Sequence, residues 1–343
     1  MHIFIISQSM VNGILLKEIF KRHTNYSIHF LNSHDQNLFQ QFKKEHFSID
    51  LILFDMAKYE TNLKEKLEFL INLFGCKILL LGKNKQKIKI SDWIFTFTDF
   101  PLNPLSYDYA QKRKALLATV KNILEHKSDK DTSIKINGPS ESLIIKKTEK
   151  IELIAIGAST GGPKVLLKIF SALPASFSIP ILTVQHIPAQ FMHMFVDWLN
   201  QSSALQVELA RNNADIKSGH IYIAPGNYHL VVTPQKRMQL VDALPEHHVK
   251  PSVSYLFKSV AEVYGQNALG VLLTGMGKDG AAELALMKAK GAITIVQSRE
   301  SCAVFGMPKA ALELGAATAV LSPEKIIKTL IDIGERYEGV NND

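Results

Sequence analysis

The chain has little cysteine and no long apolar run. Its two cysteines, Cys76 and Cys302, lie far apart and match no spacing of metal ligands. This argues against a disulfide framework and makes a reducing cytoplasm the simplest expected location. No apolar run approaches the ~20 residues that cross a bilayer, and the opening segment, residues 1–6, is too short for a signal peptide. We therefore expect no membrane insertion.

The sequence also lacks an arginine-rich stripe with interleaved aromatic residues. Its net charge is +7, but residues 151–343 are balanced, with 16 Lys+Arg against 16 Asp+Glu. The excess lies in residues 1–125, with 17 against 12, and in residues 126–150, with 6 against 4. This distribution favours a solvated lysine surface over a nucleic-acid site.

Residues 1–125 alternate between short apolar runs and amphipathic stretches. The expected strands are 2–6, 27–31, 50–54, 77–81 and 93–97, and the expected helices are 14–21, 37–44, 63–73 and 109–124. Five strands with crossovers predict an α/β domain with a parallel, flavodoxin-like sheet. Residues 126–150 are polar and without a strong period, so we expect a linker there.

Residues 151–343 predict a second doubly wound, mostly parallel domain. Expected strands are 151–156, 179–184, 268–273 and 292–296, with helices following Pro188 and Pro251. Three short runs, 220–223, 229–232 and 238–241, are separated by turns. They suggest a β-hairpin insertion beside this sheet.

Ser159 stands on a glycine-bounded turn between an apolar strand and a helical run. Gly157 and Gly161 flank it in a G-x-S-x-G pattern, whose small residues allow a sharp turn that pushes the hydroxyl into the open. Such a serine can be a nucleophile. The alternative is a strand-to-helix turn with a capping serine.

Two further polar residues follow expected parallel strands. His186 comes after the strand 179–184, and Asp279 comes shortly after the strand 268–273. Sites in open α/β sheets lie at such carboxyl ends. A structural histidine and an N-cap aspartate are the alternatives. The order Ser, His, Asp differs from that of α/β-hydrolases, and a dinucleotide G-x-G-x-x-G would need glycine in place of Ser159.

These residues belong to a longer series of motifs that resembles the chemotaxis protein-glutamate methylesterases (CheB). The series comprises GASTGG at 157–162, QHIP at 185–188, IAPG at 223–226, HL at 229–230, PSV at 251–253, LF at 256–257, LTGMGKDG at 273–280, Gln297, SC at 301–302 and VFGMP at 304–308. The resemblance covers most of residues 151–325.

The resemblance implies a cytoplasmic serine hydrolase that needs no cofactor and acts in chemotaxis signal transduction. Ser159, His186 and Asp279 would form its triad, the Met276 amide would meet the oxyanion, and Thr160 would hydrogen-bond in the site or cap the helix. The substrates would be glutamate γ-methyl esters, and particular glutamines for deamidation, on methyl-accepting chemoreceptors. A chemotaxis histidine kinase would be a second partner.

Residues 1–125 resemble the response-regulator receiver domain that precedes this catalytic domain in the family. Asp55 would be the phosphoacceptor, but Ser7 and Gln8 replace the expected acidic pair, and Gly82 and Phe100 replace the expected hydroxyl residue and lysine. One carboxylate should bind Mg²⁺ poorly, so we expect no metal site. Either the domain is a relic serving as a cap, or an unusual arrangement supports phosphorylation.

A second function for the whole chain is a non-catalytic regulatory or scaffold protein that acts by partner binding. Loss of selection on the chemistry should then have damaged the triad. Ser159, His186 and Asp279 are all present, which favours the enzyme.

Overall fold

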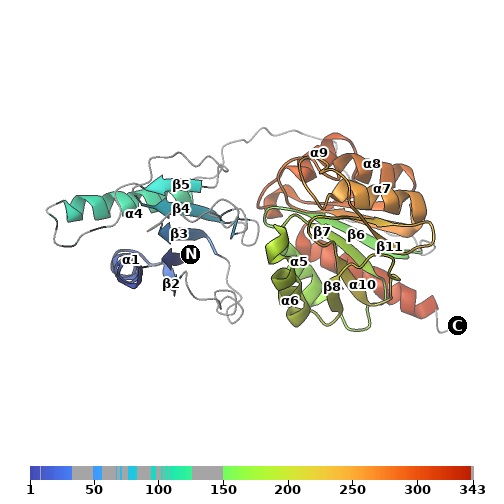
Figure 1. Cartoon of the computed structure of the whole chain (residues 1–343), viewed down its shortest axis with the longest axis horizontal. Coiled ribbons are helices and arrows are strands. Elements are labelled where there is room, and N and C mark those ends of the chain that lie inside the picture. The colour runs from blue at the N-terminus through green and yellow to red at the C-terminus, as the bar shows by residue number, and fades with distance from the viewer. Residues whose placement is uncertain are drawn as a thin grey trace. The chain divides into compact units, whose positions relative to one another are not determined.

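The computed structural model describes residues 1–7, 9–32, 49–55, 76–82, 94–97, 109–125 and 150–340, with a few positions at 67, 70–71, 102, 104, 106 and 108. The chain forms two compact units, Met1–Ile134 and Lys135–Asp343 (Figure 1). Among the described residues, no helix has both the length and the apolar character that a membrane span requires.

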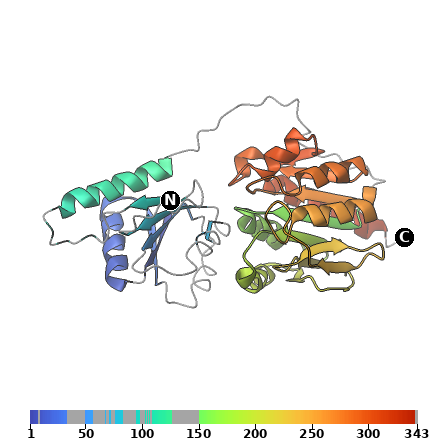
Figure 2. The same ribbon diagram turned by 45° about the horizontal axis from the view of Figure 1, so that its top comes forward.

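The N-terminal unit is built on a five-stranded parallel sheet. Its strands are β1 (His2–Ser7), β2 (Ser27–Asn32), β3 (Leu51–Asp55), β4 (Lys77–Leu81) and β5 (Ile94–Phe97), in the order β2-β1-β3-β4-β5. Helices α1 (Met10–His23) and α4 (Tyr109–Glu125) pack on one face, where Leu16 and Leu116 join a buried cluster with Ile3 and Ile5 (Figure 2). Alternate residues such as Phe4 face the other side of the sheet.

The expected strands of this unit correspond to β1 to β5. Helix α1 begins at Met10, four residues before the expected start, because Ser9 is its N-cap and accepts the Asn12 N–H at 3.2 Å. The expected helix 37–44 lies outside the described residues, as does most of 63–73.

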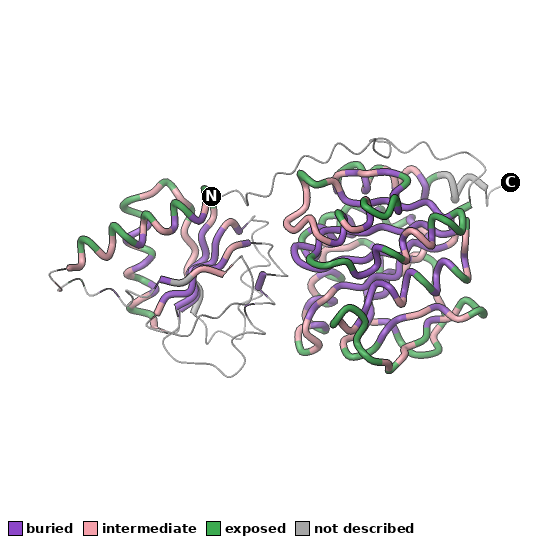
Figure 3. Tube along the Cα trace, turned by 90° about the horizontal axis from the view of Figure 1, so that it is seen from above, coloured by how far each residue is buried: buried purple, intermediate pink, exposed green. Residues whose placement is uncertain are grey.

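The C-terminal unit contains a seven-stranded parallel sheet, which confirms the prediction of a mostly parallel α/β domain. Its order is β14-β13-β12-β6-β7-β9-β8. The strands are β6 (Leu153–Ala158), β7 (Ile181–Gln185), β8 (Gln206–Leu209), β9 (His220–Ile223), β12 (Ala268–Leu272), β13 (Ile293–Gln297) and β14 (Ala319–Leu321). The central strands are wholly buried, as Figure 3 shows in purple.

Helices cover both faces of this sheet. One layer holds α7 (Val253–Val263), α8 (Ala281–Ala289) and α9 (Met307–Glu313), and the other holds α5 (Gly162–Ala172), α6 (Met192–Ser202) and α10 (Pro323–Val340) (Figure 1). A separate antiparallel pair, β10 (His229–Val232) and β11 (Met238–Val241), packs beside α7. Strands β8 and β14 were not expected, because these short edge strands lack a long apolar run.

Candidate active site

The three residues of the expected triad follow three neighbouring strands. Ser159 follows β6, His186 follows β7, and the loop that carries Asp279 follows β12. Backbone hydrogen bonds tie these ends together, because the Ser159 N–H donates to the Thr274 carbonyl at 3.0 Å and the His186 N–H donates to the Ala158 carbonyl at 3.1 Å. The sheet order therefore places the serine between the histidine and the aspartate loop.

The turn that carries Ser159 is shaped by close backbone packing. Gly161 is the N-cap of α5, with φ of 79°, and makes no side-chain capping bond, so the capping alternative for Ser159 is wrong. Ser159 is only 7% exposed, which differs from the expectation that the turn pushes its hydroxyl into the open. Gly275 is one close neighbour, since an added Cβ there would lie 2.7 Å from the Ser159 Cβ. The serine lies at the amino end of α5, whose dipole favours negative charge there.

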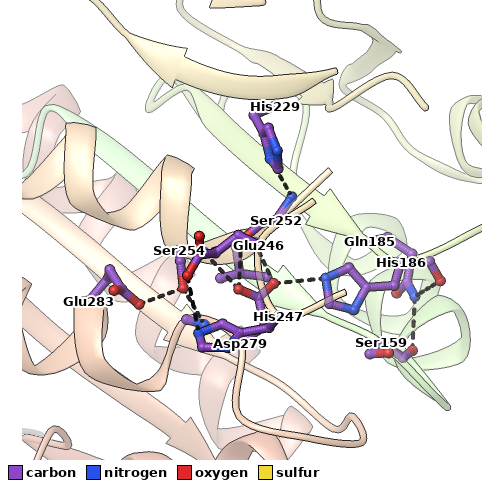
Figure 4. Close-up of polar contacts among 12 residues, drawn as sticks. Ser159, Gln185, His186, His229, Glu246, His247, Ser252, Ser254, Asp279 and Glu283 are labelled. Carbon is purple, nitrogen blue, oxygen red and sulfur yellow. Dashed lines mark hydrogen bonds and ion pairs between the residues drawn. The ribbon is translucent and has the colours of Figure 1, made fainter. Parts of the chain in front are cut away.

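His186 and Asp279 form a hydrogen-bonded pair. The His186 Nε2 lies 2.9 Å from the Asp279 Oδ2, and Asp279 is 3% exposed. Because the carboxylate is an acceptor, Nε2 carries the proton of the neutral ring, and Nδ1 is left as the basic nitrogen. Ser159 lies beside His186 in Figure 4, although no hydrogen bond joins their side chains in residues 150–340. Such bonds often tighten only when substrate binds.

Asp279 accepts four hydrogen bonds. Oδ1 accepts from the Ser252 Oγ at 2.7 Å and the Ser254 N–H at 3.1 Å, and Oδ2 accepts from the Val253 N–H at 2.7 Å as well as from His186. Burial alone would raise the pKa of Asp279, but the bonds from His186, Ser252 and Val253 outweigh it and lower the pKa to about 2.

The N-cap alternative for Asp279 is wrong for its own helix. The N-cap of α8 is Gly280, and the Asp279 carboxylate instead meets the first turn of α7, whose N-cap is Ser252. The positive end of the α7 dipole adds to the stability of the ionised carboxylate. Asp279 is thus held as an anion at the end of a helix distant in sequence.

The backbone around Met276 offers an unused donor. The Gly275 N–H donates to Val304 at 3.0 Å, and the Gly275 carbonyl accepts from Gly306 at 3.0 Å and Met307 at 2.9 Å. The Met276 N–H makes no hydrogen bond within residues 150–340, and the residue is 68% exposed. A fixed donor beside the serine is what an oxyanion hole requires.

Thr160 is buried on the turn that carries Ser159. Its carbonyl accepts from the Thr274 Oγ1 at 2.9 Å, which joins the turn to the β12 loop. The N-cap of α5 is Gly161, so the capping alternative for Thr160 is wrong at that position.

The sequence alone assigned no role to Gln185, although this residue contacts the backbones of both Ser159 and His186. It is fully buried, and its Nε2 donates to the Ser159 carbonyl at 2.8 Å and to the His186 carbonyl at 3.2 Å. One amide thus holds the backbones of both residues. The available signal was an uncharged polar residue at the end of an apolar strand, directly before the histidine.

Replacing Gln185 with leucine should lower kcat about tenfold with little change in KM, because only the positions of Ser159 and His186 are loosened. Two backbone carbonyls lose a buried donor, so the free energy of unfolding should fall by about 1–3 kcal/mol. Steady-state kinetics and denaturant unfolding test this, with the exposed Gln206→Leu as the control. An unchanged kcat would count against the role.

The N-terminal unit places Asp55 at the end of β3, beside Ser7 at the end of β1. Its buried Oδ2 accepts from the Ser7 Oγ at 2.5 Å and the Asn12 Nδ2 at 3.0 Å. These neighbours are neutral and already donate to the carboxylate, so they do not fit Mg²⁺, which prefers several oxygen ligands and charge neutralisation. Gly82 follows β4, whereas Gln8 and Phe100 lie outside the described residues.

Known proteins resemble the C-terminal unit. Residues 154–330 match the sequence model described as CheB methylesterase. A protein-glutamate methylesterase/protein-glutamine glutaminase of Syntrophus aciditrophicus is 50% identical over 188 residues, covering 55% of this chain and 54% of the relative. One of Nitrosospira multiformis is 47% identical over 196 residues, covering 57% and 55%. The chain spans about half the length of these curated relatives.

A solved structure also matches this unit. The catalytic domain of a CheB methylesterase from Thermotoga maritima is 37% identical, with a TM-score of 0.52. The match covers 54% of this chain and 99% of that domain.

Proposed function

This chain belongs to the CheB methylesterase family, and from that premise we propose that it hydrolyses glutamate γ-methyl esters on methyl-accepting chemoreceptors. We also propose that it deamidates receptor glutamines, since its relatives carry both activities in their names. The observation that carries the proposal is the buried His186–Asp279 pair beside Ser159 at neighbouring strand ends.

The proposed reaction uses only side chains and backbone of the C-terminal unit. The Ser159 hydroxyl attacks the ester carbonyl while His186 Nδ1 accepts its proton, and the Asp279 carboxylate stabilises the imidazolium that forms. The Met276 N–H donates to the oxyanion, assisted by the amino end of α5. His186 then protonates the departing methanol, and a water activated by His186 releases glutamate from Ser159. With glutamine as substrate, ammonia departs instead.

Methanol release from methylated receptor tests this proposal. The full-length chain should release methanol continuously, and Ser159→Ala should not. A scaffold that acts by partner binding would bind the receptor without turnover. Receptor binding with no methanol release by the intact chain would therefore favour the scaffold.

Acidification should lower the rate of methanol release between about pH 8 and about pH 5, because a protonated imidazole cannot accept the serine proton. Asp279 does not contribute to this fall. Its pKa is lowered to about 2, so it stays ionised throughout that range and titrates only in stronger acid. Initial rates at saturating receptor, with protein integrity checked at each pH, measure the profile. A flat profile would contradict histidine as the base.

For the N-terminal unit we propose a receiver-like domain that no longer takes phosphate, with a chemotaxis histidine kinase as the partner to be tested. The Ser7–Asp55 bond supports this, since a neutral hydroxyl occupies the place of a metal-binding carboxylate. We further propose a cytoplasmic location, because the chain has only two cysteines, which lie far apart in sequence and match no spacing of metal ligands.

Replacing Asp55 with asparagine should leave the esterase rate within about threefold of the wild-type rate. If Asp55 is not phosphorylated in the wild-type protein, the substitution removes no activating phosphate. Adding a small-molecule phosphodonor with Mg²⁺ should likewise change neither the rate nor the mass of the protein. Methanol release and intact-protein mass measure both. Stable phosphate on Asp55 with a large rise in rate would show that the receiver works.

A further inference from the structure

A second histidine lies behind the triad. His229 is fully buried at the start of β10. Its Nδ1 lies 3.1 Å from the Ser252 backbone nitrogen, and its Nε2 lies 3.0 Å from the Leu244 carbonyl oxygen. An N–H faces one ring nitrogen and a carbonyl the other, so the neutral ring is fixed with its proton on Nε2. His229 therefore accepts from Ser252 and donates to Leu244.

Ser252 connects His229 to the triad. Its Oγ donates to the Asp279 Oδ1, and the next two backbone N–H groups, of Val253 and Ser254, also donate to this carboxylate. Three of the four donors to Asp279 thus come from the consecutive residues 252–254. His229 holds the first of these residues, Ser252, by accepting its backbone N–H. Figure 4 shows this row of side chains from His229 through Ser252 and Asp279 to His186.

The surroundings of His229 keep the ring neutral and immobile. It stacks on Tyr255 of α7, with ring centroids 3.9 Å apart and planes at 12°. Burial lowers the pKa of His229, and the charge of Lys250 acts in the same direction, whereas the Leu244 carbonyl and the carboxylates of Asp279 and Glu246 oppose them. Protonation at Nδ1 would set two donors against each other at Ser252, so the neutral form suits this contact.

We propose that His229 is a positioning residue of the triad, which acts through Ser252 to hold the Asp279 carboxylate in line with His186. The proposal rests on the proposed function in that Ser159 must act as a nucleophile. The simpler alternative is a histidine that only anchors the chain at Leu244. The two arms of the ring separate these roles, since one contacts Ser252 and the other contacts Leu244.

Two polar substitutions of His229 each keep one of its two hydrogen bonds. In His229→Asn the side-chain oxygen can take the place of Nδ1 and still accept from Ser252, while the bond to Leu244 is lost. In His229→Gln the side-chain amide can reach Leu244, while the acceptor for Ser252 is lost. His220→Gln is a matched control, because His220 also stacks on a tyrosine, Tyr222, and contacts a carbonyl, that of Ser218.

The first measurement is the rate at which an organofluorophosphonate labels Ser159 in the full-length chain, which needs no receptor. His229→Gln should lower this rate and kcat about tenfold or more. Removing the hydrogen-bond partner that orients a metal-binding histidine causes a loss of similar size in metal sites. KM should stay within about twofold, and His229→Asn and His220→Gln should label within about threefold of wild type. The downfield proton signal of the His186–Asp279 bond should weaken in His229→Gln alone.

Ser252→Ala tests the route. The fold loss of labelling rate in the double variant with Ser252→Ala and His229→Gln should be smaller than the product of the fold losses in the two single variants, because both residues act on one carboxylate. If thermal melts show that His229→Gln is unfolded, His229→Asn must remain near wild type while Ser252→Ala loses activity. Equal losses in His229→Asn and His229→Gln, a greater loss in His229→Asn, or independent effects of His229 and Ser252 would overturn the proposal.

The outcomes also separate this proposal from the proposed function. A wild-type chain that labels at Ser159 but releases no methanol would refute the esterase on receptors and leave the role of His229 open to the labelling test. Wild-type methanol release with unchanged labelling in His229→Gln would refute the role of His229 alone.

Discussion

Replacing Ser159 with alanine is expected to reduce methanol release by about three orders of magnitude or more, and His186→Ala should cause a similar loss. The alanine at 159 removes the proposed nucleophile, and the alanine at 186 removes the base proposed to accept its proton. The double variant should be little slower than either single variant, because the two residues act in the same step. The remaining rate would come from the Met276 donor and substrate binding.

Turnover and serine labelling measure these effects. Ser171→Ala, at the exposed carboxyl end of α5 and away from the site, controls for the loss of a serine hydroxyl from the same helix region. Thermal melts of each variant show that the fold is kept. Hydrolysis by Ser159→Ala within about tenfold of wild type would exclude this serine as the nucleophile.

Asp279→Asn should be less damaging than Ser159→Ala, yet it should still lower kcat by orders of magnitude, and it should also destabilise the protein. Both carboxylate oxygens accept backbone N–H groups, Val253 on one side and Ser254 on the other. Either orientation of an asparagine amide therefore sets a donor against a donor. With the NH₂ group toward His186, the ring must also reverse its tautomer and present an N–H to Ser159.

The loss of stability in Asp279→Asn should be about 1–3 kcal/mol, the cost of an unsatisfied buried donor. It should also depend on pH. The folded pKa of Asp279 is lowered to about 2 from its usual 3.8, so its ionisation stabilises the fold above pH 3.8, and this contribution disappears as the pH falls toward 2. Unfolding of wild type and variant should converge in that range, with the exposed Asp215→Asn as the control. A constant difference would contradict it.

The sequence predicted the strands that place the proposed triad but not the contacts that hold its residues. Apolar runs before Ser159, His186 and Asp279 were enough to put all three at strand ends, because fully buried parallel strands are nearly all apolar. The capping rule misled for Asp279, because it considers only the helix next in sequence. The carboxylate instead meets the first turn of α7, which is not the helix next to it in sequence, so the contact is visible only in the folded structure.

The same limit applies to Gln185, His229 and the N-terminal site. A glutamine that holds two strand ends has no local pattern that distinguishes it from any polar residue after a strand. The absence of an acidic residue at position 7 was legible in the sequence. The bond from Asn12 to Asp55 was not, because it depends on α1 beginning at Met10.

The attachment of Asp279 to the first turn of α7 links chemistry to the completion of folding. Val253, Leu256, Phe257 and Val260 of this helix are fully buried, so its docking is part of forming the core. A chain whose α7 has not docked exposes Asp279 to water and leaves His186 without its orienting bond. We therefore expect partly folded molecules to be inactive as hydrolases. The turnover rate per molecule should then measure the fraction of native protein during refolding.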